Sequence, residues 1–245
     1  MDFREYLKVY DMLKDIDKEL RNNIDFNYKR KTHHKLIRYK DYYGVRTSIN
    51  RDISLKYFEL IKDLDKEKIL NLCNELLESG IHEKKTIAFD WAFRIKDKYI
   101  ENDFYLFESW LYKYINNYGL CDDLCKHALG EIICQHPSFI SKLYQWIKED
   151  NFWLRRGATV TLIYLVNKID VLDISFDICK KLFNDKEDLV QKGYGWLLKE
   201  LSENYEDNVF NFLIKNKNNI PRVALRYAIE KMPEKKRCIV LRKKD

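Results

Sequence analysis

NFWLRRGATVTLI, residues 151–163, is apolar at almost every position after the first, which indicates a helix buried on most sides. Asn151 suits the N-cap, where a side-chain oxygen accepts a backbone N–H. Arg155 and Arg156 fall in the first turn, where a cation opposes the helix macrodipole by a few tenths to about 1 kcal/mol. A well-formed helix that breaks a local rule is a place to look for function. We therefore expect an anionic partner for these arginines.

The composition around this helix indicates a globular, all-helical protein. The chain has 245 residues, 46% of them hydrophobic and 14% aromatic, which is typical of a folded chain with a substantial core. Only 7 glycines and 3 prolines occur, so we expect helices joined by short loops. The net charge of +6 is compatible with a nucleic-acid partner without requiring one.

The apolar patterning excludes membrane proteins. No apolar run approaches the roughly 18 residues that a membrane-spanning helix needs, and the N-terminus MDFREYLKVY has no apolar signal core. We expect a cytoplasmic protein with six reduced cysteines. The spacing of Cys121, Cys125, His127, Cys134 and His136 fits no common zinc signature. Because Cys121 and Cys125 share a helix face with apolar residues, we expect core thiols, with no metal and no cofactor.

Beyond Asp97 the apolar residues repeat in helix pairs. The first helices carry Phe107 and Trp110, then Leu143 and Trp146, then Ile178 and Leu182, then Phe210 and Leu213. The second helices are expected at 121–135, 153–167, 188–200 and 222–231. Pairs that repeat every ~35–45 residues predict a HEAT-like α-solenoid, a superhelix with a concave groove lined by the second helices. An irregular helical bundle is the alternative.

The N-terminal part predicts helices before these repeats. We expect one domain over 1–245, with N-terminal helices in 1–47 and helix-pair repeats in 48–245. Ser48 is expected to cap a helix that runs to about Leu60, and Asp65 to cap one that ends at Gly80. The basic run KRKTHHKLIRYK, residues 29–40, is either a solvated helix face or a DNA-backbone contact.

Charged residues recur at matching positions of the second helices. Asp122, Arg156, Lys192 and Arg222 follow one another at intervals of 34, 36 and 30 residues. In a solenoid such positions form a stripe, and a basic stripe in a groove is a natural track for phosphates. Arg226 follows Arg222 on the same helix face.

Trp196 lies away from the expected core face of the helix 188–201. At about 100° per residue, Val190, Tyr194, Leu197 and Leu201 form that core face, while Trp196, Lys192 and Lys199 lie elsewhere. Gly193 and Gly195 flank the tryptophan and indicate close approach by another group. Trp196 either packs on a neighbouring repeat or contacts a nucleotide between the two lysines.

Asp122 is the only acid in the stripe, and Tyr118 precedes it by one turn. It is either an ordinary first-turn acid or a catalytic carboxylate.

Several segments resemble the AlkD-like DNA alkylation repair family, over about residues 36–235. They are WLRRGATVTLIY, VQKGYGWLLKELS, IPRVALRYAIEKMP, GLCDDLCKHALG and YYGVRTS. The resemblance implies HEAT-like repeats and a monofunctional DNA glycosylase that excises cationic N3- and N7-alkylated purines from duplex DNA. It implies no metal and no flipping of the lesion into a pocket. We expect a monomer that is associated with the nucleoid when bound to DNA.

The resemblance also implies residue roles. Asp122 matches the catalytic aspartate, Arg156 a DNA-contacting arginine, and Trp196 an aromatic residue that faces the lesion. Tyr118-Gly119 replaces the family's usual Trp-Asp pair, and Lys199 stands where better-known members have arginine. Residues expected to contact DNA are Arg155, Arg156, Lys192, Lys199, Arg222 and Arg226.

Asp122 would then stabilise the oxocarbenium-like sugar, and Tyr118 and Trp196 would contact the deoxyribose. Of the two first-turn arginines, we expect Arg156 to face DNA and Arg155 to point elsewhere. The alternative is a non-catalytic HEAT-repeat module that binds DNA structures or a protein, because a fold alone does not determine function.

Overall fold

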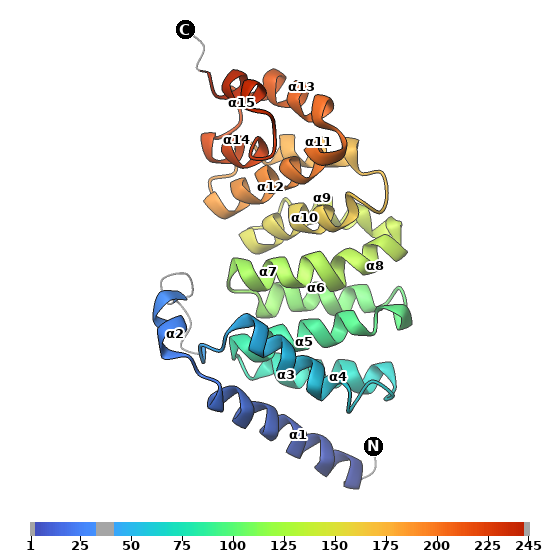
Figure 1. Cartoon of the computed structure of the whole chain (residues 1–245). Coiled ribbons are helices and arrows are strands. Elements are labelled where there is room, and N and C mark those ends of the chain that lie inside the picture. The colour runs from blue at the N-terminus through green and yellow to red at the C-terminus, as the bar shows by residue number, and fades with distance from the viewer. Residues whose placement is uncertain (1–2, 33–41, 243–245) are drawn as a thin grey trace. The chain divides into compact units, whose positions relative to one another are not determined.

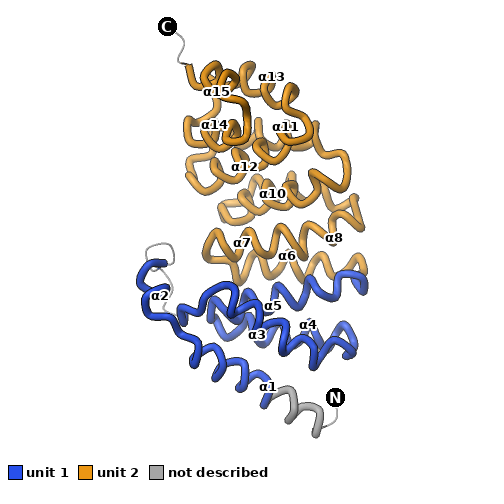
Figure 2. The backbone as a smooth tube through the Cα atoms, viewed as in Figure 1, with its two compact units in different colours: residues 1–99 blue, residues 100–245 orange. Residues whose placement is uncertain are grey.

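The computed structural model describes residues 3–32 and 42–242, and all regular elements within these ranges are helices (Figure 1). The prediction of an all-α fold is confirmed. The chain divides into two compact units, Met1–Tyr99 and Ile100–Asp245 (Figure 2). None of the described helices is long and apolar enough to cross a membrane. Most of the basic run 29–40 lies outside the described residues.

The helices of the first unit include the two that the sequence predicted from Ser48 and Asp65. The helices of this unit are α1 (Phe3–Asn22), α2 (Phe26–Thr32), α3 (Thr47–Phe58), α4 (Lys66–Glu78), α5 (His82–Arg94) and the short 3₁₀ turn η2 (Lys96–Lys98). Asp65 occupies the N-cap position of α4 as expected, but its side chain makes no capping hydrogen bond. Gly80 follows the end of the helix with φ 76°, as expected. The expectation for Ser48 was wrong. Arg46 is the last extended residue, so α3 begins at Thr47 and Ser48 lies inside its first turn.

A buried carboxylate holds the turn before α3. Glu83, only 1% exposed, accepts backbone N–H bonds from Tyr43, Gly44 and Val45 at 3.1, 2.7 and 3.1 Å. Three such bonds offset the cost of burying the charge. Gly44 has φ 94°, a conformation that favours glycine. The YYGVRTS segment is therefore a structural turn of the first unit.

The second unit consists of helix pairs. The first helices are α6 (Asp103–Tyr114), α9 (Ile140–Trp146, after the 3₁₀ turn η4, Pro137–Phe139), α11 (Leu172–Lys181) and α13 (Glu206–Asn216). The second helices are α7 (Tyr118–Leu124) with η3 (Cys125–Leu129) and α8 (Gly130–Gln135), then α10 (Phe152–Leu165), α12 (Asp188–Asn204) and α14 (Arg222–Ala228). A further helix, α15 (Glu234–Leu241), was not expected from the sequence.

The second helices pack against one another in chain order. Helix α10 contacts α7 and η3 on one side and α12 on the other, and α12 contacts α14 (Figure 1). Helix α10 is buried along most of its length, and the side chain of Asn151 accepts the N–H of Trp153 at 3.0 Å. The segment 151–163 is therefore the capped, buried helix that its sequence predicts, at the centre of this stack.

Two glycines allow α12 to approach its neighbours closely. A Cβ on Gly193 would lie 2.7 Å from Thr159 Oγ1 of α10, and a Cβ on Gly195 would lie 2.7 Å from the Ala224 carbonyl oxygen of α14. The close approach that these glycines indicate is thus made by neighbouring helices.

Gly195→Ala is expected to destabilise the protein by about 1–3 kcal/mol, the usual range for overpacking. The new methyl group would meet a backbone oxygen that cannot move without shifting α14. Urea unfolding followed by circular dichroism measures the change. Gly119→Ala is the matched control, since Gly119 is exposed and its nearest new contact is Asn117 Oδ1 at 3.1 Å. Equal stability of the Gly195 variant and the wild type would contradict this packing role.

Candidate active site

Asp122 lies on a helix whose start is fixed by a cap that the sequence patterns did not reveal. Asn117 Oδ1 accepts the backbone N–H of Leu120 at 2.9 Å and so begins α7. Beyond Leu124 the helix widens into the π-helical segment η3. Such segments are rare and occur frequently at functional sites. Cys121 and Cys125 are fully buried on this helix, as expected for core thiols.

Asp122 and Arg156 form a bidentate ion pair. Arg156 Nε donates to Asp122 Oδ1 and Nη2 donates to Oδ2, both at 2.9 Å. The third nitrogen, Nη1, donates to the Leu189 carbonyl oxygen of α12 at 2.6 Å. One guanidinium therefore joins α7, α10 and α12. Asp122 and Arg156, which occupy matching positions of consecutive repeats in the sequence, are therefore in contact in the structure.

The two side chains of this pair differ in exposure. The Arg156 side chain is 6% exposed, whereas that of Asp122 is 21% exposed. Burial raises the pKa of the Asp122 carboxyl, and the charge and hydrogen bonds of Arg156 oppose this rise. Burial would lower the pKa of Arg156, but Asp122 raises it overall. The geometry is that of a charged pair in which the carboxylate, and not the guanidinium, reaches solvent.

Arg155 has its own internal partners. Its Nε donates to Asp185 Oδ2 at 2.6 Å, and its Nη1 donates to the carbonyl oxygens of Glu149 and Asp150 at 2.7 and 2.9 Å. Both first-turn arginines thus have anionic partners as expected, but these are aspartates of the same chain. All three nitrogens of the Arg156 guanidinium donate to groups of the chain, and its side chain is 6% exposed; its contact with DNA stays a prediction.

Trp196 is half-buried on α12, and two charged side chains contact it. Its indole Nε1 donates to Glu200 Oε1 at 2.8 Å, one turn further along the helix. The ammonium of Lys126, which follows Asp122 by one turn, lies 4.7 Å from the centre of the indole ring. Lys126 links Trp196 to the Asp122 helix, a role that the sequence did not suggest. Its spacing of four residues from Asp122 was the available signal.

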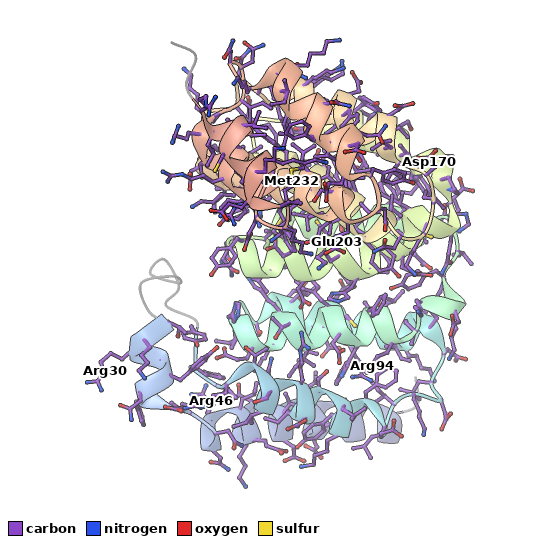
Figure 3. The ribbon with its side chains drawn as sticks, turned by 45° about the horizontal axis from the view of Figure 1, so that its top comes forward. Arg30, Arg46, Arg94, Asp170, Glu203 and Met232 are labelled. Carbon is purple, nitrogen blue, oxygen red and sulfur yellow. The ribbon has the colours of Figure 1, made fainter. Side chains whose placement is uncertain are left out.

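The remaining candidate cations divide into paired and exposed groups. Lys192 is half-exposed and pairs with Asp188 at 2.5 Å, and Lys199 pairs with Glu230 at 3.1 Å. Arg222 and Arg226 are exposed on α14. Two glutamates near the end of α12, Glu200 and Glu203, both pair with Lys231; Figure 3 labels Glu203. Acidic as well as basic side chains therefore lie at this end of the helix.

Tyr118, the expected second aromatic residue, begins α7 and is 38% exposed. It lies one turn before Asp122 and is available to a ligand at the surface. Tyr227 on α14, which the sequence did not single out, is 37% exposed and has its Cβ beside Gly195.

The second unit thus holds a carboxylate, its guanidinium support and an exposed basic helix. A family model described as DNA alkylation repair enzyme matches residues 16–232. The chain belongs to the DNA alkylation repair enzyme family. The match includes the helices that carry Asp122, Arg156 and Trp196.

Solved structures agree with this family fold. A predicted DNA alkylation repair enzyme from Enterococcus faecalis is 16% identical, with a TM-score of 0.72 over 84% of this chain and 95% of that one. The protein smu.31 from Streptococcus mutans UA159 is 21% identical, with a TM-score of 0.55 over 76% of this chain and 96% of that one. No curated protein matches the sequence. At these identities the structural similarities establish the fold alone.

The site offers a carboxylate and its polar and aromatic neighbours for chemistry. Among the described residues, no group of three or more His, Cys, Asp or Glu side chains could hold a metal ion. The described part of the chain brings together Asp122 and Arg156, and Lys126 and Trp196.

Proposed function

We propose that the protein is a monofunctional DNA glycosylase that hydrolyses the N-glycosidic bond of cationic N3- and N7-alkylated purines in duplex DNA. The observation that carries the proposal is the Asp122 carboxylate, held on both oxygens by the buried Arg156 and still partly exposed. Family membership supplies the substrate class, damaged DNA.

The chemistry suits a single oriented carboxylate. An alkylated purine already carries a positive charge, so it leaves without protonation. The enzyme must stabilise the oxocarbenium-like sugar and place water, and a fixed negative charge near the anomeric carbon serves both needs. A carboxylate has about four lone-pair sites, of which the Arg156 fork uses two, so the others can accept water or face the sugar.

The aromatic residues would contact the deoxyribose next to this carboxylate. Tyr118 precedes Asp122 by one turn, and Trp196 is tied to the same helix through Lys126. Their ring faces carry partial negative charge and would support a developing cation. Half-exposed residues of this kind suit a base that stays in the duplex rather than one flipped into a pocket.

The exposed cations would bind phosphates. Arg222, Arg226 and Lys192 are the candidates, since phosphate contacts fix position and salt dependence rather than sequence. Arg156 acts instead as a positioning residue for Asp122, and Arg155 supports the loops around α10. Lys199 reaches DNA only if it leaves Glu230.

The test of this function is a base-release assay on duplex DNA methylated at N7 of guanine, combined with binding titrations at two salt concentrations. Release of free 7-methylguanine by the wild-type protein is the expected result. Salt-sensitive binding without release would identify a non-catalytic DNA-binding module. Absent or salt-insensitive DNA binding would contradict both and favour a protein partner.

Arg222→Ala is expected to weaken binding to undamaged duplex DNA and to lower the slope of log K against log salt by about one unit. The physical reason is the loss of one exposed phosphate contact. Lys215→Ala is the control, since Lys215 is an exposed cation on α13, a first helix. Equal slopes for the Arg222 variant and the wild type would remove α14 from the DNA-binding surface.

A further inference from the structure

Lys126 places a positive charge beside both the carboxylate and the aromatic ring of the site. It lies in η3, one helical turn after Asp122. Its ammonium is 4.7 Å from the centre of the Trp196 ring, within the range of a cation–π contact. Burial raises the pKa of Asp122, and the charges of Arg156 and then of Lys126 lower it, so Lys126 also attracts the carboxylate.

The ring that Lys126 covers is held in place from its edge. Trp196 Nε1 donates to Glu200, and Glu200 in turn lies 3.4 Å from the ammonium of Lys231. The indole is therefore held at its ring nitrogen by Glu200 of α12, while Lys126 lies over its ring. A ligand that reaches this face of the ring must first move the lysine.

The position held by Lys126 has the properties that a cationic ligand needs. An aromatic face and a nearby carboxylate both attract positive charge, and their attraction is stronger where water is partly excluded. A base or sugar that carries a positive charge would use the same two groups. Neutral purines would gain much less from the exchange, because they lack the charge that Trp196 and Asp122 attract.

We propose that Lys126 occupies the cation subsite of the free protein and competes with the positively charged lesion for the face of Trp196. The inference rests on the proposed function and adds a specificity-determining residue to it. Lys126 sets how strongly the protein prefers a cationic base to a neutral one, because each cationic base must displace an equally charged side chain. Tight binding of the lesion therefore requires the lysine to leave the ring.

The experiment compares two duplexes of one sequence. One carries 7-methylguanine on a 2′-fluoro sugar, which prevents cleavage, and the other carries guanine. The measured quantity is the ratio of the dissociation constant for the guanine duplex to that for the methylated duplex. Lys126→Met, which keeps length and removes charge, is expected to raise this ratio about two- to fivefold, the range of an exposed cation–π contact. A general loss of DNA affinity with the positive charge affects both duplexes equally and cancels in the ratio.

Three controls separate competition at the ring from loss of charge. Lys126→Arg keeps the cation and should leave the ratio near that of the wild type. Lys192→Met removes a half-exposed lysine that pairs with Asp188, and should weaken both duplexes equally. In a Trp196→Leu background, Lys126→Met should change the ratio much less, because the ring is gone and only Asp122 still attracts the two cations.

The outcomes decide the inference independently of the reaction. A ratio that is unchanged or lower in Lys126→Met overturns the inference. So does an equal rise of the ratio when Lys126→Met is made in the Trp196→Leu background. Failure of all variants to bind either duplex overturns it as well. If the ratio rises but the wild type releases no base from ordinary methylated DNA, the glycosylase proposal fails and the role of Lys126 stands. If the wild type releases base but the ratio is unchanged, the glycosylase proposal stands and the role of Lys126 fails.

Discussion

Asp122→Asn is expected to reduce the release of 7-methylguanine from methylated duplex DNA by roughly a hundredfold or more, the scale on which a lost electrostatic contact slows such reactions. The amide keeps the shape of the side chain but removes the negative charge that would face the sugar. It also turns an NH₂ group toward one N–H donor of Arg156, so a stability loss of about 1–3 kcal/mol accompanies the change. Affinity for undamaged DNA should stay close to the wild-type value, because Asp122 contributes no phosphate contact.

Asp123→Asn is the matched control for this variant. Asp123 is the next residue on α7, it is half-buried, and it pairs with His127 at 3.1 Å rather than with Arg156. Its loss should leave base release within a few-fold of the wild type. Rates are measured below the unfolding temperature of each variant, so that stability does not enter. Full activity of Asp122→Asn would exclude Asp122 as the catalytic group.

The sequence predicted the helices of the second unit well because their patterns are local. The apolar segment after Asn151, with its capping side chain, predicted a helix over 153–167, within two residues of α10 at each end. Core and off-core faces of α12 follow from a 3.6-residue period, and Tyr194 and Leu197 are fully buried while Trp196 is not. Helix boundaries were predicted less well where several neighbouring residues could be the N-cap. At the start of α3, Ser48 was predicted to be the N-cap, but Arg46 occupies that position.

These local patterns could not predict which residues contact each other between helices. The dipole-opposed arginines correctly indicated anions, but a helical period cannot tell an external phosphate from Asp122 or Asp185. The glycines beside Trp196 likewise indicated close approach without identifying α10 and α14. Repeat register came nearest to the site, since the 34-residue interval from Asp122 to Arg156 does correspond to a contact between stacked helices.

Arg156→Met is expected to destabilise the protein by about 3–5 kcal/mol, the cost of leaving one charge of a buried pair without its partner. The variant keeps most of the side-chain volume but removes three hydrogen bonds that join α7, α10 and α12. Base release should fall with it, since Asp122 loses its orientation. The salt dependence of binding to undamaged DNA should not change, and a slope lowered by one unit would identify Arg156 as a phosphate contact after all. Lys192→Met, which breaks a half-exposed pair, should cost no more than about 1 kcal/mol.

The pH dependence of this loss tests its physical cause. Without Arg156, burial and the charge of Asp123 raise the pKa of Asp122 further above the ordinary 3.8, and of the charges that lowered it Lys126 remains. A carboxyl whose pKa is higher in the folded than in the unfolded state binds more protons when folded, so lower pH favours the folded variant. The stability gap between Arg156→Met and the wild type should therefore narrow as the pH falls from 7 toward 5. Unfolding free energies at several pH values measure the gap.

Asp122→Asn combined with Arg156→Met should recover part of the stability that Arg156→Met loses, without restoring activity, because no unpaired charge of this pair then remains buried. A gap that is constant with pH would mean that lost packing, and not the unpaired carboxylate, destabilises the variant.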